Sequence, residues 1–366
     1  ETTACRPGEG EGCERELEKA LGELKRAGAT AYILDIRDNP GGLLDQAFAV
    51  SNLFLKKGQL VVYTRGRTRR EESNYVTEEE SPWSDVPLVV LTSRHSASAS
   101  EIVAGALQDH DRALIVGETT FGKGLVQTIM PLRNVRGYAL ALTTARYYTP
   151  SGRSIQRDYA STALEEYYSP RDRKACDQGS GEVKLTDSGR KVYGGDGITP
   201  DYCVEPETPA KFVSYLIGRQ AFADFARGYE AAEGQGQAAI AGTGTRSQAA
   251  STKVKPIRRD FRVDDAVLRE FRTYVEARKL RFTDEDFTSN RDEIARRLEE
   301  QVLMQVFGEG EARRRSVAWD PQIVKALALI PRAEMLIQDP KTYVAERERD
   351  RRLADAAAGS PAPARP

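Results

Sequence analysis

Two stretches of the sequence place an apolar run, a small-residue loop and an amphipathic helix in the same order. AYILDI (31–36) runs into RDNPGG, and helical spacing resumes from Leu44 to Phe54. PLVVLT (87–92) runs into SRHSAS, and EIVAGAL (101–107) then places its apolar residues on one helical face. Because a strand followed by a crossover helix leads to a parallel neighbour, this repeated order predicts an α/β layer up to about residue 150.

Shorter patterns extend this layer on both sides. Residues 14–27 have leucines at helical spacing and end at Gly28, which favours a helix with a glycine cap. ALIV (113–116) reads as a third strand. LVQTIMPL and GYALALTTARYY are rich in β-formers with no helix between them, which indicates a hairpin.

The chain changes character after residue 208. The segment 229–253 is poor in bulky apolar residues and rich in Gly, Ala, Gln and Ser, as flexible linkers are. Apolar residues then recur at helical spacing, and Pro321 is well placed to start a helix. We expect five parts: an N-terminal remnant 1–13, a core 14–208, a helix and flexible linker 209–253, a helical C-terminal region 254–345 and a disordered tail 346–366.

Bulk composition excludes several classes of protein. The 54 basic and 55 acidic residues nearly cancel, so no global field attracts nucleic acid. No apolar run approaches the roughly 18 residues of a membrane-spanning helix. The four cysteines form no CxxC pair, and only two histidines are present, so a zinc cluster has little to build on. A disulfide between Cys5 and Cys13 would suit an oxidising compartment, but free thiols fit the sequence equally well.

GETTFGKG (117–124) resembles a phosphate-binding P-loop. A P-loop needs a Ser or Thr after its lysine and a helix whose first amides hold the phosphates. Here Gly124 follows Lys123, and the next residues are strand-like. We therefore set nucleotide binding aside and look for another role for Lys123.

HSASASEI offers a nucleophile. Ser98 or Ser100 could simply cap the following helix, with Glu101 in its first turn, and taken alone this explanation is preferable. A hydroxyl at a strand-to-helix turn can also act as a nucleophile, with the next backbone amide as oxyanion donor. His95 and His110 have no evident carboxylate to orient them, whereas a lysine in apolar surroundings can replace histidine as the base.

Four motifs in this order resemble the C-terminal processing peptidases, also called tail-specific proteases. They are ILDIRDNPGGLL, VVLTSRHSASASEIVAGAL, IVGETTFGKGLVQT and TTARYYTPSGRSIQ, followed by GITPD, and they cover roughly residues 14–206. The resemblance implies a crotonase-like (ClpP-like) α/β core followed by a helical C-terminal region. It implies a serine endopeptidase with no metal and no cofactor.

The resemblance also implies roles for particular residues. The nucleophile falls on Ser98, the general base on Lys123, and the glutamine that orients the base on Gln127. The oxyanion donors fall on the amide of Ala99 and on one glycine of NPGG, Gly41 or Gly42. Of the two glycines we favour Gly41.

The resemblance implies a PDZ domain N-terminal to the first helix, and we expect this sequence to be a catalytic core without that part, with ACRPGEGEGC before the first helix. Tail specificity is therefore open, and a non-catalytic or weakly active peptide-binding scaffold is the alternative. A crotonase-fold acyl-CoA enzyme is a second rival, but it would not require a serine and lysine together. The resemblance further implies protein substrates bound by their C-terminal tails, a homo-oligomer or adaptor contact through the helical region, and a cell-envelope or periplasmic location.

Overall fold

A computed structural model describes residues 12–68, 72–132, 137–158, 175–176, 181–231 and 255–358. The chain forms two compact units. Unit 1 combines residues 1–205 with 321–366, and unit 2 comprises 206–320. The predicted N-terminal remnant, the flexible linker and the last residues of the predicted tail lie largely outside the described residues.

Unit 1 is built on a parallel sheet whose strand order is β1-β4-β5-β10. These strands are β1 (Tyr32–Asp35), β4 (Leu88–Thr92), β5 (Leu114–Gly117) and β10 (Tyr202–Cys203). Helix α1 (Cys13–Arg26) precedes β1, α2 (Leu44–Asn52) lies in the connection from β1 to β4, and α3 (Ala99–Asp109) connects β4 to β5. The predicted α/β layer is therefore present.

Both faces of this sheet are covered by helices. Leu88, Val90 and Ile115 pack in one apolar cluster with residues of α1, α2 and α3. The alternate residues Val89 and Leu91 pack in another cluster with α11 (Pro321–Ala328), α12 (Ile330–Gln338) and α13 (Pro340–Ala358). Strands buried on both faces read as continuous apolar runs, as β4 does.

The return of the last three helices to unit 1 differs from our expectation of one helical region over 254–345. Ala333 and Leu336 of α12 are almost completely buried in the cluster that covers the sheet. Helix α13 continues through most of the segment for which we expected disorder from residue 346. Residues 206–320 are therefore inserted between the last strand of the parallel sheet and the helices that cover it.

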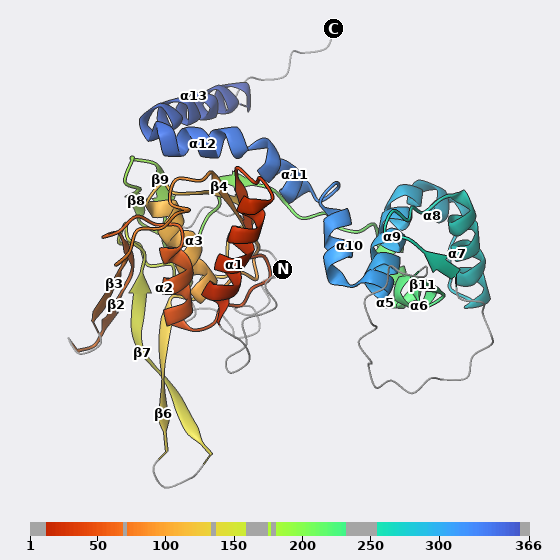
Figure 1. Cartoon of the computed structure of the whole chain (residues 1–366), viewed down its shortest axis with the longest axis horizontal. Coiled ribbons are helices and arrows are strands. Elements are labelled where there is room, and N and C mark those ends of the chain that lie inside the picture. The colour runs from red at the N-terminus through yellow and green to blue at the C-terminus, as the bar shows by residue number, and fades with distance from the viewer. Residues whose placement is uncertain are drawn as a thin grey trace. The chain divides into compact units, whose positions relative to one another are not determined.

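A second, antiparallel sheet has the order β3-β2-β7-β6. Its strands are β2 (Leu60–Gly66), β3 (Ser73–Val76), β6 (Leu125–Pro131) and β7 (Ala139–Tyr148). The predicted hairpin is present as β6 and β7, and Figure 1 shows it extending away from the rest of unit 1. A short hairpin of β8 (Val183–Leu185) and β9 (Lys191–Tyr193) follows.

Unit 2 is helical, with two short parallel strands. Its elements are α5 (Lys211–Gly218), α6 (Ala221–Ala226), β11 (Tyr229–Ala231), β12 (Lys255–Ile257), α7 (Asp265–Ala277), α8 (Asp284–Ser289), α9 (Arg291–Phe307) and α10 (Glu309–Ser316). Asp264 caps α7 by accepting the amide of Val267, and Phe271 lies in the centre of an aromatic cluster. None of the described helices is long and apolar enough to cross a bilayer.

A disulfide joins Cys176 to Cys203, with 5.8 Å between their α-carbons. It ties the segment after β7 to β10, beside the end of β5. Cys13 is also disulfide-bonded, and the partner considered for it, Cys5, lies outside the described residues. The pairing that the sequence left open is thus settled for Cys176 and Cys203.

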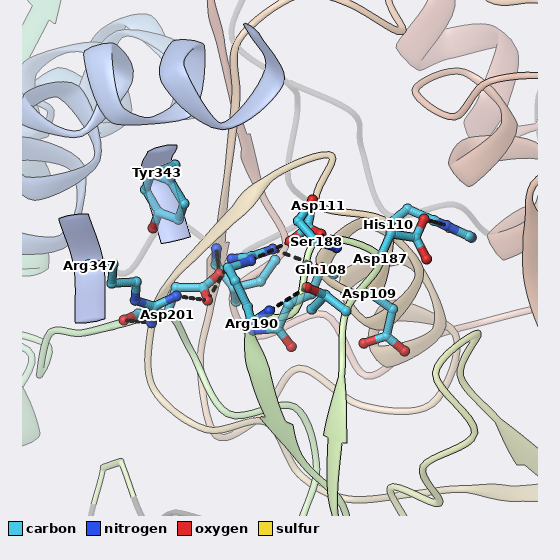
Figure 2. A network of polar contacts seen from close by, with 12 residues as sticks. Gln108, Asp109, His110, Asp111, Asp187, Ser188, Arg190, Asp201, Tyr343 and Arg347 are labelled. Carbon is cyan, nitrogen blue, oxygen red and sulfur yellow. Dashed lines mark hydrogen bonds and ion pairs between the residues drawn. The ribbon is translucent and has the colours of Figure 1, made fainter. Parts of the chain in front are cut away.

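Buried charges connect α13 to the parallel sheet (Figure 2). Arg190, which is almost completely buried, forms ion pairs with Asp111 and Asp201. Arg347 of α13 forms a second ion pair with Asp201, at 2.7 Å. Asp201 also accepts the amide of Ile115 in β5, at 2.9 Å. Buried ions need such pairing, because desolvation alone would cost several kcal/mol per charge.

The buried carboxylate of Asp201 is expected to make unit 1 less stable as the pH becomes acidic. Burial raises the pKa of its carboxyl, but Arg190 and Arg347 outweigh burial and bring the pKa down to about 2 from 3.8. Because the pKa of Asp201 is lower in the folded protein than its ordinary value of 3.8, the carboxylate stabilises the fold at pH values above about 4. This stabilisation is lost as the pH falls toward 2. We expect the unfolding temperature of the parent to drop more steeply between about pH 4 and pH 2 than that of Asp201→Asn.

Calorimetry at a series of pH values measures this slope, and Asp260→Asn, at an exposed position of unit 2, is the matched control. The Asp201→Asn variant should also be less stable at neutral pH, because Arg190 loses one of its two buried partners. If the unfolding temperature falls equally steeply with pH in the parent and in Asp201→Asn, the Asp201 carboxylate does not contribute to the pH dependence of stability.

Candidate functional site

The candidate residues lie at one edge of the parallel sheet. Loop 38–42 follows the carboxyl end of β1, loop 93–98 follows β4, and loop 118–124 follows β5. These strands are neighbours in the order β1-β4-β5 and run parallel, so their three loops meet. The carboxyl edge of a parallel sheet is where α/β proteins bind ligands.

Ser98 immediately precedes α3 and has an unusual backbone conformation. Its φ is +58° and its ψ is −114°, a region that residues other than glycine seldom occupy. Such a conformation costs on the order of 1–3 kcal/mol and persists only where the surroundings impose it. The strand-to-helix turn thus holds Ser98 in a strained geometry at the sheet edge.

The alternating serines of HSASASEI have different roles. Ser96 donates its hydroxyl to the carbonyl of Ile36 at 2.8 Å, and Ser100 donates its hydroxyl to the carbonyl of Asn39 at 3.1 Å. Both are buried, and both fasten the loop after β1. Ser98 is half-buried, and backbone contacts hold it. Its hydroxyl is therefore the candidate nucleophile of the three.

Gly41 lies directly against the turn of Ser98. Its φ is +93°, and a β-carbon there would approach the carbonyl oxygen of Ala97 to 2.5 Å and the amide nitrogen of Ala99 to 2.8 Å. Only glycine fits this position. The structure therefore brings together Gly41 and Ala99, two of the residues considered for an oxyanion hole.

The two glycines of NPGG differ in their surroundings. The N–H of Gly41 is donated to the side-chain oxygen of Asn39 at 2.9 Å. Gly42 is exposed, and a β-carbon there would meet no atom within 4 Å. Gly41, which we favoured as a donor, therefore already has an acceptor in this structure.

Lys123 lies in the loop between β5 and β6. Gly122 has a φ of +91°, and a β-carbon there would come within 2.9 Å of Arg157. A β-carbon on Gly124 would come within 3.0 Å of the amide of Gln156. A strand follows Lys123 where a P-loop would have a helix, so the glycines serve close packing of the loop.

Glu101 connects the turn of Ser98 to the loop of Lys123. Its carboxylate accepts the amide of Ser98 at 2.8 Å and the amide of Lys123 at 2.9 Å, both through the same oxygen. The other oxygen accepts the amide of Gly122 at 2.8 Å and the hydroxyl of Thr120 at 2.6 Å. A single buried side chain therefore fixes the backbones of both candidate catalytic residues.

Burial governs the electrostatics of Glu101. Its side chain is fully buried, and burial raises the pKa of the carboxyl above its ordinary value. The four hydrogen bonds act in the opposite direction, because donors that point at a carboxylate favour its charged form. The sequence showed only the helix-cap role of Glu101, and its S-x-x-E spacing gave no sign of the contacts to Gly122 and Lys123.

Tyr147 of β7 makes a second connection between the same two residues. Its hydroxyl lies 3.1 Å from the carbonyl oxygen of Ser98 and also contacts the carbonyl oxygen of Lys123. The side chain is almost completely buried. Glu101 thus binds the backbone amides of Ser98 and Lys123, and Tyr147 contacts the backbone carbonyls of the same two residues. Sequence reasoning missed Tyr147, because nothing in YYTP distinguishes it from its neighbour Tyr148.

The histidines are placed where neither supports a Ser/His pair. His110 follows the C-terminus of α3 and is the C-cap of the helix that Ser98 begins, which places it about 18 Å from Ser98 at a rise of 1.5 Å per residue. Its two ring nitrogens lie 2.7 Å from the Asp187 carboxylate and 2.7 Å from the carbonyl of Leu60. His95 is exposed. Lysine is therefore the better candidate for the base.

Gln127 lies on β6, four residues after Lys123. Its backbone is opposite Thr143 of β7, and its side chain is exposed. No hydrogen bond joins Gln127 to Lys123 within the described ranges, so its role in orienting the amine stays a prediction. In the same ranges, no three His, Cys, Asp or Glu side chains are grouped so as to hold a metal ion.

Comparison with known proteins shows which peptidases this region is similar to. Residues 9–162 match Peptidase family S41. The chain is 42% identical over 212 residues to the carboxy-terminal-processing protease of Bartonella bacilliformis, covering 57% of this chain and 39% of that protein. It is 45% identical over 142 residues to the carboxyl-terminal-processing protease of Picosynechococcus sp., covering 39% and 33%.

A solved structure described as photosystem II D1 C-terminal processing protease is 32% identical, with a TM-score of 0.38, over 52% of this chain and 39% of that one. The chain spans less than half the length of these relatives. Residues 9–162 match peptidase family S41, and the resemblance to C-terminal processing peptidases is confirmed.

The hydrogen bonds of Tyr147 lead to a prediction about Ser98. Tyr147→Phe removes the hydroxyl that contacts the carbonyls of Ser98 and Lys123, so the two loops are held less firmly in position. A shift of about 1 Å at a catalytic group can lower the rate about 100-fold. We expect the labelling of Ser98 by a serine-directed fluorophosphonate to slow by roughly 10- to 100-fold.

Tyr148→Phe is the matched control, because it removes the neighbouring phenol, whose ring stacks on Tyr63 away from these carbonyls. Labelling of the intact protein, followed by mass spectrometry, gives both rates. The positioning role of Tyr147 fails if both variants label at the parental rate.

Proposed function

We propose that this chain carries the catalytic part of a serine endopeptidase that cleaves proteins near their C-termini through a Ser98/Lys123 dyad. The proposed core is the crotonase-like (ClpP-like) type. The observation that carries the proposal is the Glu101 carboxylate, which joins the amides of Ser98 and Lys123 through one oxygen. The bond between Glu101 and the amide of Ser98 belongs to the capping box of α3, but a helix cap alone would not require the second bond, to the amide of Lys123.

The proposed reaction proceeds by acylation and deacylation. The hydroxyl oxygen of Ser98 attacks the peptide carbonyl carbon while the amine of Lys123 accepts the hydroxyl proton. The carbon–nitrogen bond then breaks, and Lys123 returns the proton to the departing amine. Water attacks the acyl-serine, with Lys123 again as the base, and releases the acid. Gln127 is proposed to orient the amine.

Backbone amides are proposed to stabilise the tetrahedral oxyanion. The amide of Ala99 follows the nucleophile at the N-terminus of α3, where the helix dipole also favours negative charge. The second donor comes from the NPGG loop. Gly41 can serve once its N–H leaves Asn39, and otherwise Gly42 supplies the donor. Removing one oxyanion donor costs about 100- to 1000-fold in rate in serine proteases.

The partners and location of the chain are part of this proposal. The substrates are proteins, and capture of their C-terminal tails is proposed from the resemblance to the processing peptidases. The disulfide between Cys176 and Cys203 supports an oxidising compartment, in keeping with the cell envelope or periplasm. Because α11, α12 and α13 cover the sheet, a homo-oligomer or adaptor contact would use the helices of unit 2.

Cleavage of an unfolded protein tests the proposed function. We expect the purified chain to degrade reduced, alkylated protein, and we expect Ser98→Ala and Lys123→Ala to lower the rate by at least about 1000-fold with unchanged unfolding temperatures. Lys123→Arg is a sharper variant, because it keeps the positive charge but cannot act as a base. It should be as inactive as Lys123→Ala.

Ser98→Ala also discriminates the alternative of a peptide-binding scaffold. A scaffold would bind peptides without consuming them, and its binding would not depend on Lys123. If the parent chain binds but never cleaves, or if all three variants cleave as fast as the parent, the dyad assignment is wrong.

A further inference from the structure

One sequence motif lies beside the candidate site but has no part in the proposed reaction. It is TTARYYTPSGRSIQ, the fourth of the four motifs, which ends at Gln156. The end of this motif runs alongside the loop that carries Lys123. The amide of Arg157 donates to the carbonyl of Gly122 at 2.9 Å, and a β-carbon on Gly124 would come within 3.0 Å of the amide nitrogen of Gln156.

Two peptide groups meet at the α-carbon of Lys123, and the first of them is held at both ends. Its carbonyl oxygen, that of Gly122, accepts the N–H of Arg157 at 2.9 Å. Its N–H, that of Lys123, donates to the carboxylate of Glu101 at 2.9 Å. Because a peptide group is planar, two hydrogen bonds at its opposite ends keep the whole plane in one orientation.

The second peptide group is also held at both ends. The carbonyl of Lys123 accepts the hydroxyl of Tyr147, and the N–H of Gly124 donates to the side-chain oxygen of Gln156 at 2.8 Å. The orientations of the two planes set φ and ψ of Lys123, and with them the direction in which its side chain leaves the backbone. Gln156 therefore supplies one of the four hydrogen bonds that aim the side chain of Lys123.

The side-chain amide of Gln156 is itself held in one orientation. Its nitrogen donates to the carbonyl of Arg157 at 2.6 Å. A carbonyl only accepts and a backbone N–H only donates, so the side-chain oxygen must face Gly124. The preceding residue, Ile155, is completely buried in the main apolar cluster, and its carbonyl accepts the N–H of Gly197 at 2.9 Å. Since Gly197 belongs to GITPD, this segment anchors the chain next to Gln156.

We propose that Gln156 is a positioning residue for the base Lys123, through the bond to the amide of Gly124. This inference rests on the proposed serine–lysine dyad and gives the fourth motif a role in the reaction. Gln127 is proposed to orient the amine at the end of the lysine side chain, whereas Gln156 holds the backbone from which that side chain starts. Without the oxygen of Gln156, Tyr147 alone holds the second peptide group, so the amine lies within reach of the serine hydroxyl for a smaller fraction of the time.

Three variants of the full chain separate the accepting oxygen of Gln156 from the size of its side chain. Gln156→Met keeps the length without the acceptor, Gln156→Ala shortens the side chain, and Gln156→Glu keeps an oxygen that accepts the amide of Gly124. The substrate is p-nitrophenyl acetate, a small ester, and the rate of Ser98→Ala is subtracted as background. We expect kcat to fall roughly tenfold in Gln156→Met and Gln156→Ala but to stay within about threefold of the parent in Gln156→Glu, with KM changed less than about twofold throughout.

Gln59→Met is the matched control. The side-chain oxygen of Gln59 also accepts a backbone amide, that of Lys56 at 2.7 Å, and Gln59 is half-buried like Gln156, but it lies in the turn before β2. Its kcat should stay within about twofold of the parent, as for most substitutions away from a site. A merely structural role of Gln156 would leave Gln156→Glu no more active than Gln156→Met, because both variants lose the bond to the carbonyl of Arg157.

Two outcomes would overturn the inference. One is a parental kcat in both Gln156→Met and Gln156→Ala, and the other is a loss in Gln156→Glu as large as that in Gln156→Met. Lys123→Ala, measured with the same ester, tests the proposed function separately. If Lys123→Ala is as fast as the parent, the dyad itself is wrong. If Lys123→Ala is inactive while Gln156→Met keeps the parental kcat, only the role of Gln156 is wrong.

Discussion

The candidate site depends on the buried carboxylate of Glu101. An ion removed from water is costly unless it is fully hydrogen-bonded, and Glu101 meets this condition with four donors from two loops. The carboxylate of Glu101 receives all four hydrogen bonds only when the turn of Ser98 and the loop of Lys123 are both in place. Because Glu101 is buried, the positions of the Ser98 and Lys123 backbones are fixed when the chain folds.

The scaffold behind this site is rigid for a separate reason. Parallel strands β1, β4 and β5 are buried on both faces, and helices from both ends of the chain cover them. The buried ion pairs of Arg190, Asp201 and Arg347 attach the last helix to the sheet (Figure 2). Loops that leave neighbouring strands of such a sheet have little freedom, so the strained backbone of Ser98 can be maintained.

The sequence predicted the elements whose periodicity is strong. The runs before RDNPGG and SRHSAS became neighbouring parallel strands, and the β-rich segments after Lys123 became a hairpin. It did not predict that α11, α12 and α13 return to the sheet, because an amphipathic helix shows that it has an apolar face but not what covers that face. The pairing of Cys176 with Cys203 was likewise not predictable, because the spacing of cysteines in a sequence does not determine which of them pair.

The roles of Glu101 and Tyr147 could not be read from the sequence for the same physical reason. Their partners are backbone amides and carbonyls, which every residue possesses, so no pattern of side chains marks the contacts. Ser98 and Lys123 could be proposed from the sequence because the motifs that contain them are specific in order and spacing. The sequence thus indicates the groups proposed to react, and the structure shows what positions them.

The reactivity of Ser98 in Glu101→Gln tests this account most directly. Glutamine keeps the shape of the side chain but places an amide NH₂ where N–H donors point, so it cannot accept all four hydrogen bonds. With the protein kept well below its unfolding temperature, we predict that fluorophosphonate labelling of Ser98 falls by at least about 100-fold relative to the parent. Labelling of Glu101→Gln at the parental rate would contradict the claim that this carboxylate assembles the site.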